Sequence, residues 1–148
     1  MGLRRKGREL ALQCLYNLDF TRLITEADEY IPRLIYQEVL NNVFDMNGVK
    51  PGDPVTTYAN ELMNVLVDRF DRIDVEIEPY LDKSRVDQLT PLDRNIMRMA
   101  IGEILYLETP APVAINEAIE IAKKFCGDVS ARFINGVLDN VVKELTRK

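Results

Sequence analysis

The chain has 148 residues, the size of one ordinary domain, and its 47% hydrophobic and 29% charged residues are typical of a globular protein. It contains no histidine, CxxC pair, P-loop, GxGxxG or GxSxG motif, so we expect neither an enzyme nor a cofactor or metal site. No apolar run reaches the roughly 20 residues that cross a bilayer, and no signal peptide is visible. Cys14 and Cys126 are expected to be buried thiols of a cytoplasmic protein.

The charge is unevenly distributed along the chain. The net charge is −5, yet the first eight residues contain four cations and no acid: Arg4, Arg5, Lys6 and Arg8. With four of the 19 bases placed there, the other 140 residues hold 15 bases against 24 acids. Because like charges this close repel one another, we expect a negatively charged ligand at this end.

The first half of the chain shows the helical period of apolar residues and no strand alternation. The first predicted helix has the apolar face Leu10, Ala11, Cys14, Leu15 and Leu18. After a turn expected at 21–28, the next helix has Pro32 in its first turn and the face Ile31, Leu34, Ile35, Val39 and Val43. The segment NGVKPGDP, 47–54, is expected to be a loop, and the long apolar run at 56–81 is expected to divide or kink.

The second half contains three further predicted helices. Thr90 is expected to cap the first, with Pro91 in its first turn and Asp93 completing a T-x-x-D box. Its face is Met97, Ala100, Ile101, Ile104 and Leu105, and the segment ETPAP at 108–112 ends it. The next face is Ile115, Ala118, Ile119, Ala122 and Phe125, and Gly127 stops that helix. Asp128 or Ser130 is expected to cap the last helix, with the face Ile134, Val137, Leu138, Val141 and Leu145. We therefore predict an all-α fold of about seven helices, forming one domain over 1–148.

Two clusters are candidate contacts for a nucleic acid. In a helix Arg4, Arg5 and Arg8 lie on one side, where guanidinium groups bind phosphates; the alternative is a frayed basic tail. The second cluster is Ser130, Arg132, Phe133 and Asn135, at a predicted helix start where amides bind phosphate and an aromatic ring stacks on an unpaired base. The alternatives are that Phe133 belongs to the core and that Ser130 is only a cap. A glycine inside a helix costs roughly 1 kcal/mol relative to Ala. We expect close packing against another helix to be the reason that Gly136 is present.

Three segments carry a resemblance to a known family: RRKGRELALQCLY, LDRNIMRMAIGEILY and VAINEAIEIAKKF…SARFINGVLDNV. They resemble the NusB transcription antitermination factors, whereas residues 21–58 contribute little. The resemblance implies an all-helical fold of two small bundles and no catalysed reaction. It also implies binding to boxA, a short single-stranded RNA in nascent ribosomal transcripts. The implied partners are a ribosomal protein acting as NusE and RNA polymerase.

The resemblance also assigns residues. It implies RNA contacts by Arg4, Arg5, Lys6, Arg8, Ser130, Arg132, Phe133 and Asn135, and contacts to the ribosomal partner by Tyr16 and Asp93. The alternative roles are packing for Tyr16 and helix capping for Asp93. Two positions depart from the family: Val129 replaces an acidic residue of many relatives, and Gly7 is expected to loosen the first helical turn. Some relatives form homodimers, and the sequence leaves the oligomeric state open.

Two other functions remain open at this point. One is a protein–protein adaptor of the same fold with weak, nonspecific RNA binding. The other is a detached RNA-targeting domain like those fused to RNA cytosine methyltransferases, for which the chain has neither the length nor the cofactor motif. An acidic body with one basic end favours a confined RNA contact together with a basic protein partner.

Overall fold

The computed structural model describes residues 2–20, 33–82 and 85–147. Over these residues the chain forms seven α-helices and two short 3-10 segments, and no strand, so the all-α prediction is confirmed. The chain divides into two compact units, Met1–Asp68 and Arg69–Lys148. The turn predicted at 21–28 and the predicted positions Ile31 and Pro32 lie outside the described residues. None of the helices described is long and apolar enough to span a membrane.

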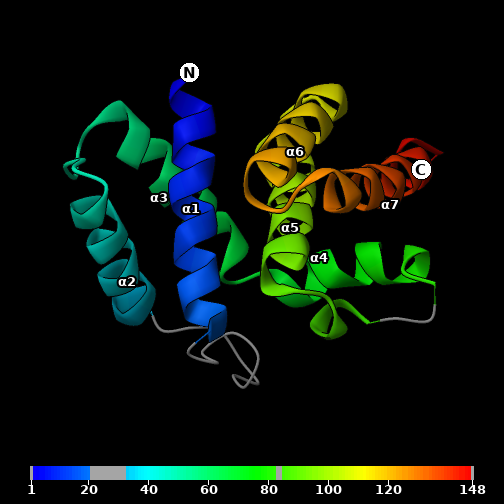
Figure 1. Cartoon of the computed structure of the whole chain (residues 1–148), viewed down its shortest axis with the longest axis horizontal. Coiled ribbons are helices and arrows are strands. Elements are labelled where there is room, and N and C mark those ends of the chain that lie inside the picture. Colours follow the sequence, from blue (N-terminus) through cyan, green and yellow to red (C-terminus); the bar gives the residue numbers. More distant parts are fainter. Residues whose placement is uncertain (1, 21–32, 83–84, 148) are drawn as a thin grey trace. The chain divides into compact units, whose positions relative to one another are not determined.

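The first unit is built on α1 (Leu3–Phe20), which packs against α2 (Arg33–Met46) and α3 (Pro54–Leu66) (Figure 1). The apolar face predicted for the first helix is wholly buried, as expected. The face predicted for α2 is only partly right, because Val43 is buried but Val39 is half-buried. The residues of α2 that join the core are Tyr36, Leu40, Val43 and Phe44.

The connection between α2 and α3 is the predicted loop, shortened by one residue. Gly48 and Gly52 have φ angles of +69° and +97°, a region that glycine adopts without strain. Pro54 starts α3 rather than ending the loop, since a proline in the first turn needs no hydrogen-bonded N–H. Asn47 Nδ2 donates to Gln13 Oε1 at 3.0 Å, which ties this loop to α1. The boundary between the two units lies after α3, between Asp68 and Arg69.

The second unit contains α4 (Phe70–Ile77), α5 (Pro91–Tyr106), α6 (Ala111–Phe125) and α7 (Asp128–Arg147), with 3-10 segments at Glu78–Tyr80 and Val86–Gln88. Helix α5 contacts the other three, and α6 packs along α7 (Figure 1). The apolar run from 56 to 81 does divide, into α3 and α4, as predicted. Thr90 caps α5 as predicted, because its hydroxyl accepts from the Asp93 N–H at 3.2 Å.

A buried ion pair joins α4 to α5. Arg98 donates from Nε and Nη2 to the two carboxylate oxygens of Asp74, both at 2.8 Å, and its Nη1 donates to Asn95 Oδ1 at 3.2 Å. Its guanidinium carbon also lies 4.8 Å from the centroid of the Phe70 ring. The Arg98 side chain is only 6% exposed, so the bidentate pair compensates for removing this charge from water.

The predicted faces of the last three helices are confirmed to different degrees. Most of the α7 face is buried, and Gly127, with φ +99°, ends α6 as expected. On α5, Met97, Ala100 and Ile101 are buried, but Leu105 is 36% exposed. On α6, Phe125 is 39% exposed, and the half-buried Ile115 and Ile119 line an apolar groove instead of the core. The core residues of α6 are Ala114, Ala118, Ile121 and Ala122.

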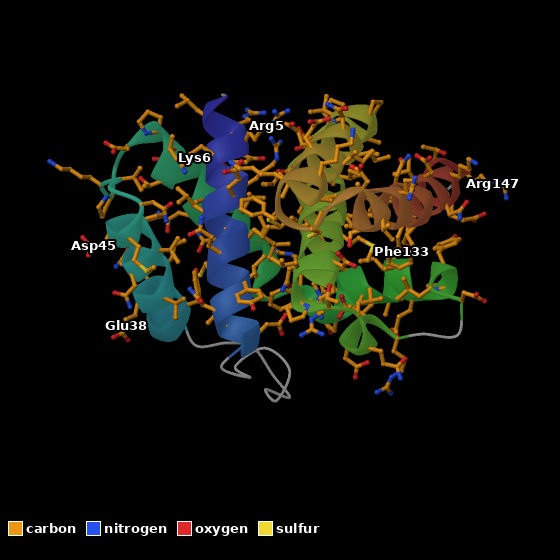
Figure 2. All side chains as sticks on the ribbon, in the orientation of Figure 1. Arg5, Lys6, Glu38, Asp45, Phe133 and Arg147 are labelled. Atoms are coloured by element: carbon orange, nitrogen blue, oxygen red, sulfur yellow. The ribbon has the colours of Figure 1, made fainter. Side chains whose placement is uncertain are left out.

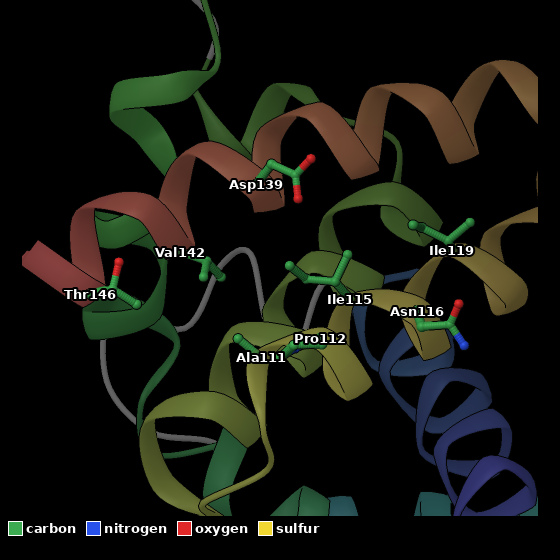
Figure 3. Close-up of a pocket in the computed structure, with 8 residues that line it drawn as sticks. All are labelled: Ala111, Pro112, Ile115, Asn116, Ile119, Asp139, Val142 and Thr146. Atoms are coloured by element: carbon green, nitrogen blue, oxygen red, sulfur yellow. The ribbon is translucent and has the colours of Figure 1, made fainter.

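This groove lies between α6 and α7 and has a volume of about 530 Å³ (Figure 3). Its lining is Ala111, Pro112, Ile115, Asn116, Ile119, Asp139, Val142 and Thr146. The alanines of α6 that belong to the core are buried, whereas Ile115 and Ile119 are half-buried in the groove lining. Helical periodicity alone does not distinguish these two positions, because both belong to the apolar side of α6.

The Asp74–Arg98 pair gives a stability prediction. Asp74→Ala leaves the Arg98 guanidinium buried without its carboxylate, so we expect the free energy of unfolding to fall by about 3 kcal/mol. Urea unfolding followed by circular dichroism measures the change. The exposed Arg72, on the same helix, provides the control, and Arg72→Ala is expected to change stability by less than about 0.5 kcal/mol. Equal effects of the two substitutions would contradict the structural role of the pair.

Candidate nucleic-acid interface

The basic segment at the start of the chain lies within α1 rather than in a frayed tail. The helix begins at Leu3, and Lys6 N–H donates to the Gly2 carbonyl at 3.1 Å. Arg4 is exposed and Arg5 and Lys6 are half-buried, whereas Arg8 is only 4% exposed. Arg5 and Lys6 point to different sides of the helix (Figure 2), as the spacing predicts. A rigid helix therefore presents the cations at Arg4, Arg5 and Lys6.

Tyr58 of α3 lies beneath two of these arginines. The guanidinium carbons of Arg4 and Arg8 are each 5.4 Å from the centroid of its ring. The prediction that Arg4 and Arg8 share one side of the helix is therefore confirmed. The electron-rich face of an aromatic ring attracts cations at this distance. Nothing in the local pattern around Tyr58 signals this contact, because it depends on how α3 packs against α1.

Gly7 allows α1 and α3 to approach closely at this point. A Cβ atom at Gly7 would lie 3.1 Å from both Tyr58 Cβ and the Val55 carbonyl oxygen. Gly7 is buried inside a regular helix, so the expectation that it loosens the first turn is wrong. Its lack of a side chain is a packing requirement.

The second predicted cluster lies in the first two turns of α7. Phe133 is 39% exposed and projects from the helix (Figure 2), so the alternative of a core residue is wrong. Arg132 is exposed, Ser130 and Asn135 are half-buried, and Val129 is 74% exposed. An exposed ring beside a guanidinium group and an amide is a surface on which an unpaired base can stack.

Asp93 joins the start of α5 to the turn between α6 and α7. Ser130 Oγ donates to Asp93 Oδ2 at 3.4 Å, and α7 begins at Asp128, so Ser130 is not the cap of that helix. The pKa of the half-buried Cys126 thiol is raised from 9.0 to about 11, first by burial and then by the charge of Asp93 and a hydrogen bond to it. Asp93 therefore lies in the capped first turn of α5, as predicted, and it also interacts with Ser130 and Cys126.

The two residues predicted to meet a protein partner belong to different units. Tyr16 is 39% exposed on α1, and Asp93 is half-buried in the first turn of α5. Cys14, on the opposite face of α1, is fully buried as predicted, and burial raises the pKa of its thiol to about 12. Cys126 is only half-buried, so the prediction of two buried thiols holds for Cys14 alone. No group of three potential metal ligands occurs within residues 2–20, 33–82 and 85–147.

The helical fold, with arginines at the start of one helix and an exposed aromatic ring near the start of another, places the chain among all-helical proteins with a candidate nucleic-acid surface. Residues 5–143 match the model of the NusB family, and the chain belongs to this family. Its relatives include the transcription antitermination proteins NusB of Desulfotalea psychrophila, 43% identical over the full length of both chains, and of Thermodesulfovibrio yellowstonii, 37% identical over 95% of this chain and 92% of the relative.

Solved structures agree with this assignment. The chain resembles Thermotoga maritima NusB with a TM-score of 0.78 and 30% identity, covering 95% of this chain and 91% of that one. It also resembles the antitermination factors NusB and NusE in complex with double-stranded RNA, with a TM-score of 0.78 and 26% identity over 97% of this chain and 98% of that one. The predicted family and fold are therefore confirmed.

The two helical glycines of these clusters give opposite predictions. Gly136 is exposed and a Cβ there would meet no atom within 4 Å, so the expectation of close packing at Gly136 is wrong. We expect Gly136→Ala to raise the free energy of unfolding by about 0.5–1 kcal/mol. Gly7→Ala is expected to lower it by about 1 kcal/mol, because the Tyr58 and Val55 atoms that the new methyl group meets are near the backbone. Urea unfolding of both variants tests the pair, and the same sign for both would contradict the packing described.

Cys126 reports on the environment of Asp93. Asp93→Asn removes a negative charge that disfavours the thiolate, so the pKa of Cys126 is expected to fall and its alkylation by iodoacetamide at pH 8 to accelerate about 3- to 10-fold. Mass spectrometry of the modified peptides measures the rate. Cys14 is the internal control, since it is buried in the other unit and its reaction should stay slow. An unchanged Cys126 rate would show that Asp93 does not act on this thiol.

Proposed function

We propose that this chain is a non-enzymatic transcription antitermination factor of the cytoplasm that binds boxA RNA of nascent ribosomal transcripts together with a ribosomal protein acting as NusE. In this proposal the assembly associates with RNA polymerase. The observation that carries it is the match to the NusB family over residues 5–143, together with the likeness to NusB in a complex with NusE and RNA.

The surface chemistry of α1 supports the RNA contact. Arg4, Arg5 and Lys6 present cations on successive positions of an ordered helix, and guanidinium groups bind phosphate through paired N–H donors. We propose Arg8, which is nearly buried, as a further member of this set. Three or four neutralised phosphates on a single strand give a slope of about −2 to −3 for the logarithm of the association constant against log salt.

The start of α7 supports a second contact. We propose that Phe133 stacks on an unpaired base and that Arg132, Ser130 and Asn135 bind the adjoining backbone or base edges. Stacking on an exposed ring is tolerant of sequence, whereas hydrogen bonds to a base edge distinguish one base from another. The exposed Val129 adds no negative charge beside these residues, which favours contact with a polyanion.

The acidic remainder of the chain supports a basic protein partner. Fifteen bases against 24 acids outside the first eight residues create a field that attracts positively charged proteins, and ribosomal proteins are commonly basic. We propose Tyr16 and Asp93 as contacts to this partner, since one offers an exposed ring and the other a carboxylate. A helical adaptor with only nonspecific RNA binding is the competing function.

Titration of a labelled single-stranded boxA RNA and a scrambled control tests the proposal, with and without the ribosomal partner and at two salt concentrations. We expect selective binding that the partner strengthens. In Arg4→Ala/Arg5→Ala/Arg8→Ala we expect binding to boxA RNA to weaken by about tenfold or more and the salt slope to become less steep by about 2.

The control variant removes cations elsewhere on the chain. Lys143→Ala/Arg147→Ala neutralises two exposed residues near the end of α7, more than two helical turns beyond Asn135, and is expected to leave RNA affinity within about twofold. Equal, weak binding of both RNAs, unaffected by the partner or by the arginine substitutions, would refute the proposal and leave the adaptor function.

A further inference from the structure

The side chains of Arg4 and Arg8 share one aromatic neighbour, the ring of Tyr58. Two cations one helical turn apart repel each other, yet Arg4 and Arg8 both hold their guanidinium carbons 5.4 Å from the centre of the Tyr58 ring. The negative face of the ring offsets this repulsion and favours one arrangement of two long, flexible side chains. The ring therefore contacts the guanidinium groups of both arginines at the start of α1.

The ring is itself fixed by its surroundings. Tyr58 is 9% exposed, and the neighbouring backbone of α1 at Gly7 is so close that a methyl group there would lie 3.2 Å from Tyr58 Cδ2. Close packing of this kind prevents the ring from changing rotamer without moving α1 or α3. Ring surface that is covered by guanidinium groups is not available to a base, so Tyr58 acts through the arginines rather than by touching RNA.

We propose that Tyr58 is a positioning residue for RNA binding, which holds the Arg4 and Arg8 side chains in place before the RNA arrives. This inference rests on the proposed function, because it assumes that the arginine-rich turns of α1 contact RNA. Attraction to a ring uses none of the N–H donors of a guanidinium group, so those of the exposed Arg4 remain available for phosphate. Ordering the side chain in advance lowers the entropic cost of binding.

Two substitutions separate the ring from its hydroxyl. Tyr58→Phe keeps the aromatic face and is expected to bind the labelled boxA RNA within about twofold of the unchanged protein. Tyr58→Leu keeps apolar bulk but has no ring, and we expect RNA affinity about 3- to 10-fold weaker. In the Arg4→Ala/Arg8→Ala background Tyr58→Leu should have no further effect, because there is no longer a guanidinium group to position.

The chain offers a matched control. Arg69 lies 4.8 Å from the ring centroid of Tyr106 in the other unit, so Tyr106→Leu removes a similar pair and is expected to leave RNA affinity unchanged. Nuclear magnetic resonance measures the contact with the ring directly, through chemical shifts that a general loss of stability does not change. The side-chain protons of Arg4 and Arg8 should be shifted upfield by the ring in the unchanged protein and in Tyr58→Phe, but not in Tyr58→Leu.

The outcomes distinguish the inference from the proposed function. If a folded Tyr58→Leu binds boxA RNA as tightly as the unchanged protein, or weakens binding equally in the Arg4→Ala/Arg8→Ala background, Tyr58 is not a positioning residue and the proposed function stands. If Tyr58→Leu does not fold, the upfield shifts in the unchanged protein decide, and their absence overturns the inference. Failure of the unchanged protein to select boxA RNA refutes the proposed function itself.

Discussion

The close approach of α1 and α3 at Gly7 is the constraint on which the basic end of this protein depends. A glycine weakens a helix, and here it stands between arginines in a segment that repels itself. The cost is offset because the backbone of α1 can lie against Val55 and Tyr58. That packing brings an aromatic ring under Arg4 and Arg8, so the residue that weakens the helix locally also gives the arginines their support.

The second unit places its polar groups by a different means. Asp93 donates its N–H to the Thr90 cap while its carboxylate accepts from Ser130, so one residue fixes the start of α5 and holds the first turn of α7. The bidentate Asp74–Arg98 pair joins α4 to the same α5. The two carboxylates differ in how far donors replace water, because Asp74 accepts two charged N–H groups at 2.8 Å whereas Asp93 accepts one hydroxyl at 3.4 Å. The exposed Phe133 therefore belongs to a helix, α7, whose first turn is joined to α5 by the hydrogen bond between Ser130 and Asp93.

Sequence periodicity predicted the helices and much of the core, but it failed where apolar residues cover more than one side of a helix. The stripe on α1 was right at every position, although burial of α1 extends beyond it to Leu12 and to the polar Arg8 and Glu9. On α6, Ile115 and Ile119 have the same period as Ala118 and Ala122, yet only the alanines are buried. Helix packing selects small residues where two axes approach most closely, and this distance is not encoded by period. The larger side chains then lie beside the contact and line the groove.

The candidate site shows the same limit at single residues. Composition identifies Arg4, Arg5 and Lys6, and a polar stretch identifies Arg132 and Phe133, since charge and aromatic character are local properties. The contact of Tyr58 with Arg4 spans α3 and α1, and no local pattern predicts it.

Gly7 and Gly136 make the point most clearly, because each has the same intrinsic cost in a helix. Gly7 has backbone and Cβ atoms 3.1 Å from where its own Cβ would be, and Gly136 has none within 4 Å. A glycine in the sequence of a helix therefore predicts a loss of helix stability. Whether packing offsets that loss depends on how closely a neighbouring helix approaches, which the local sequence does not show.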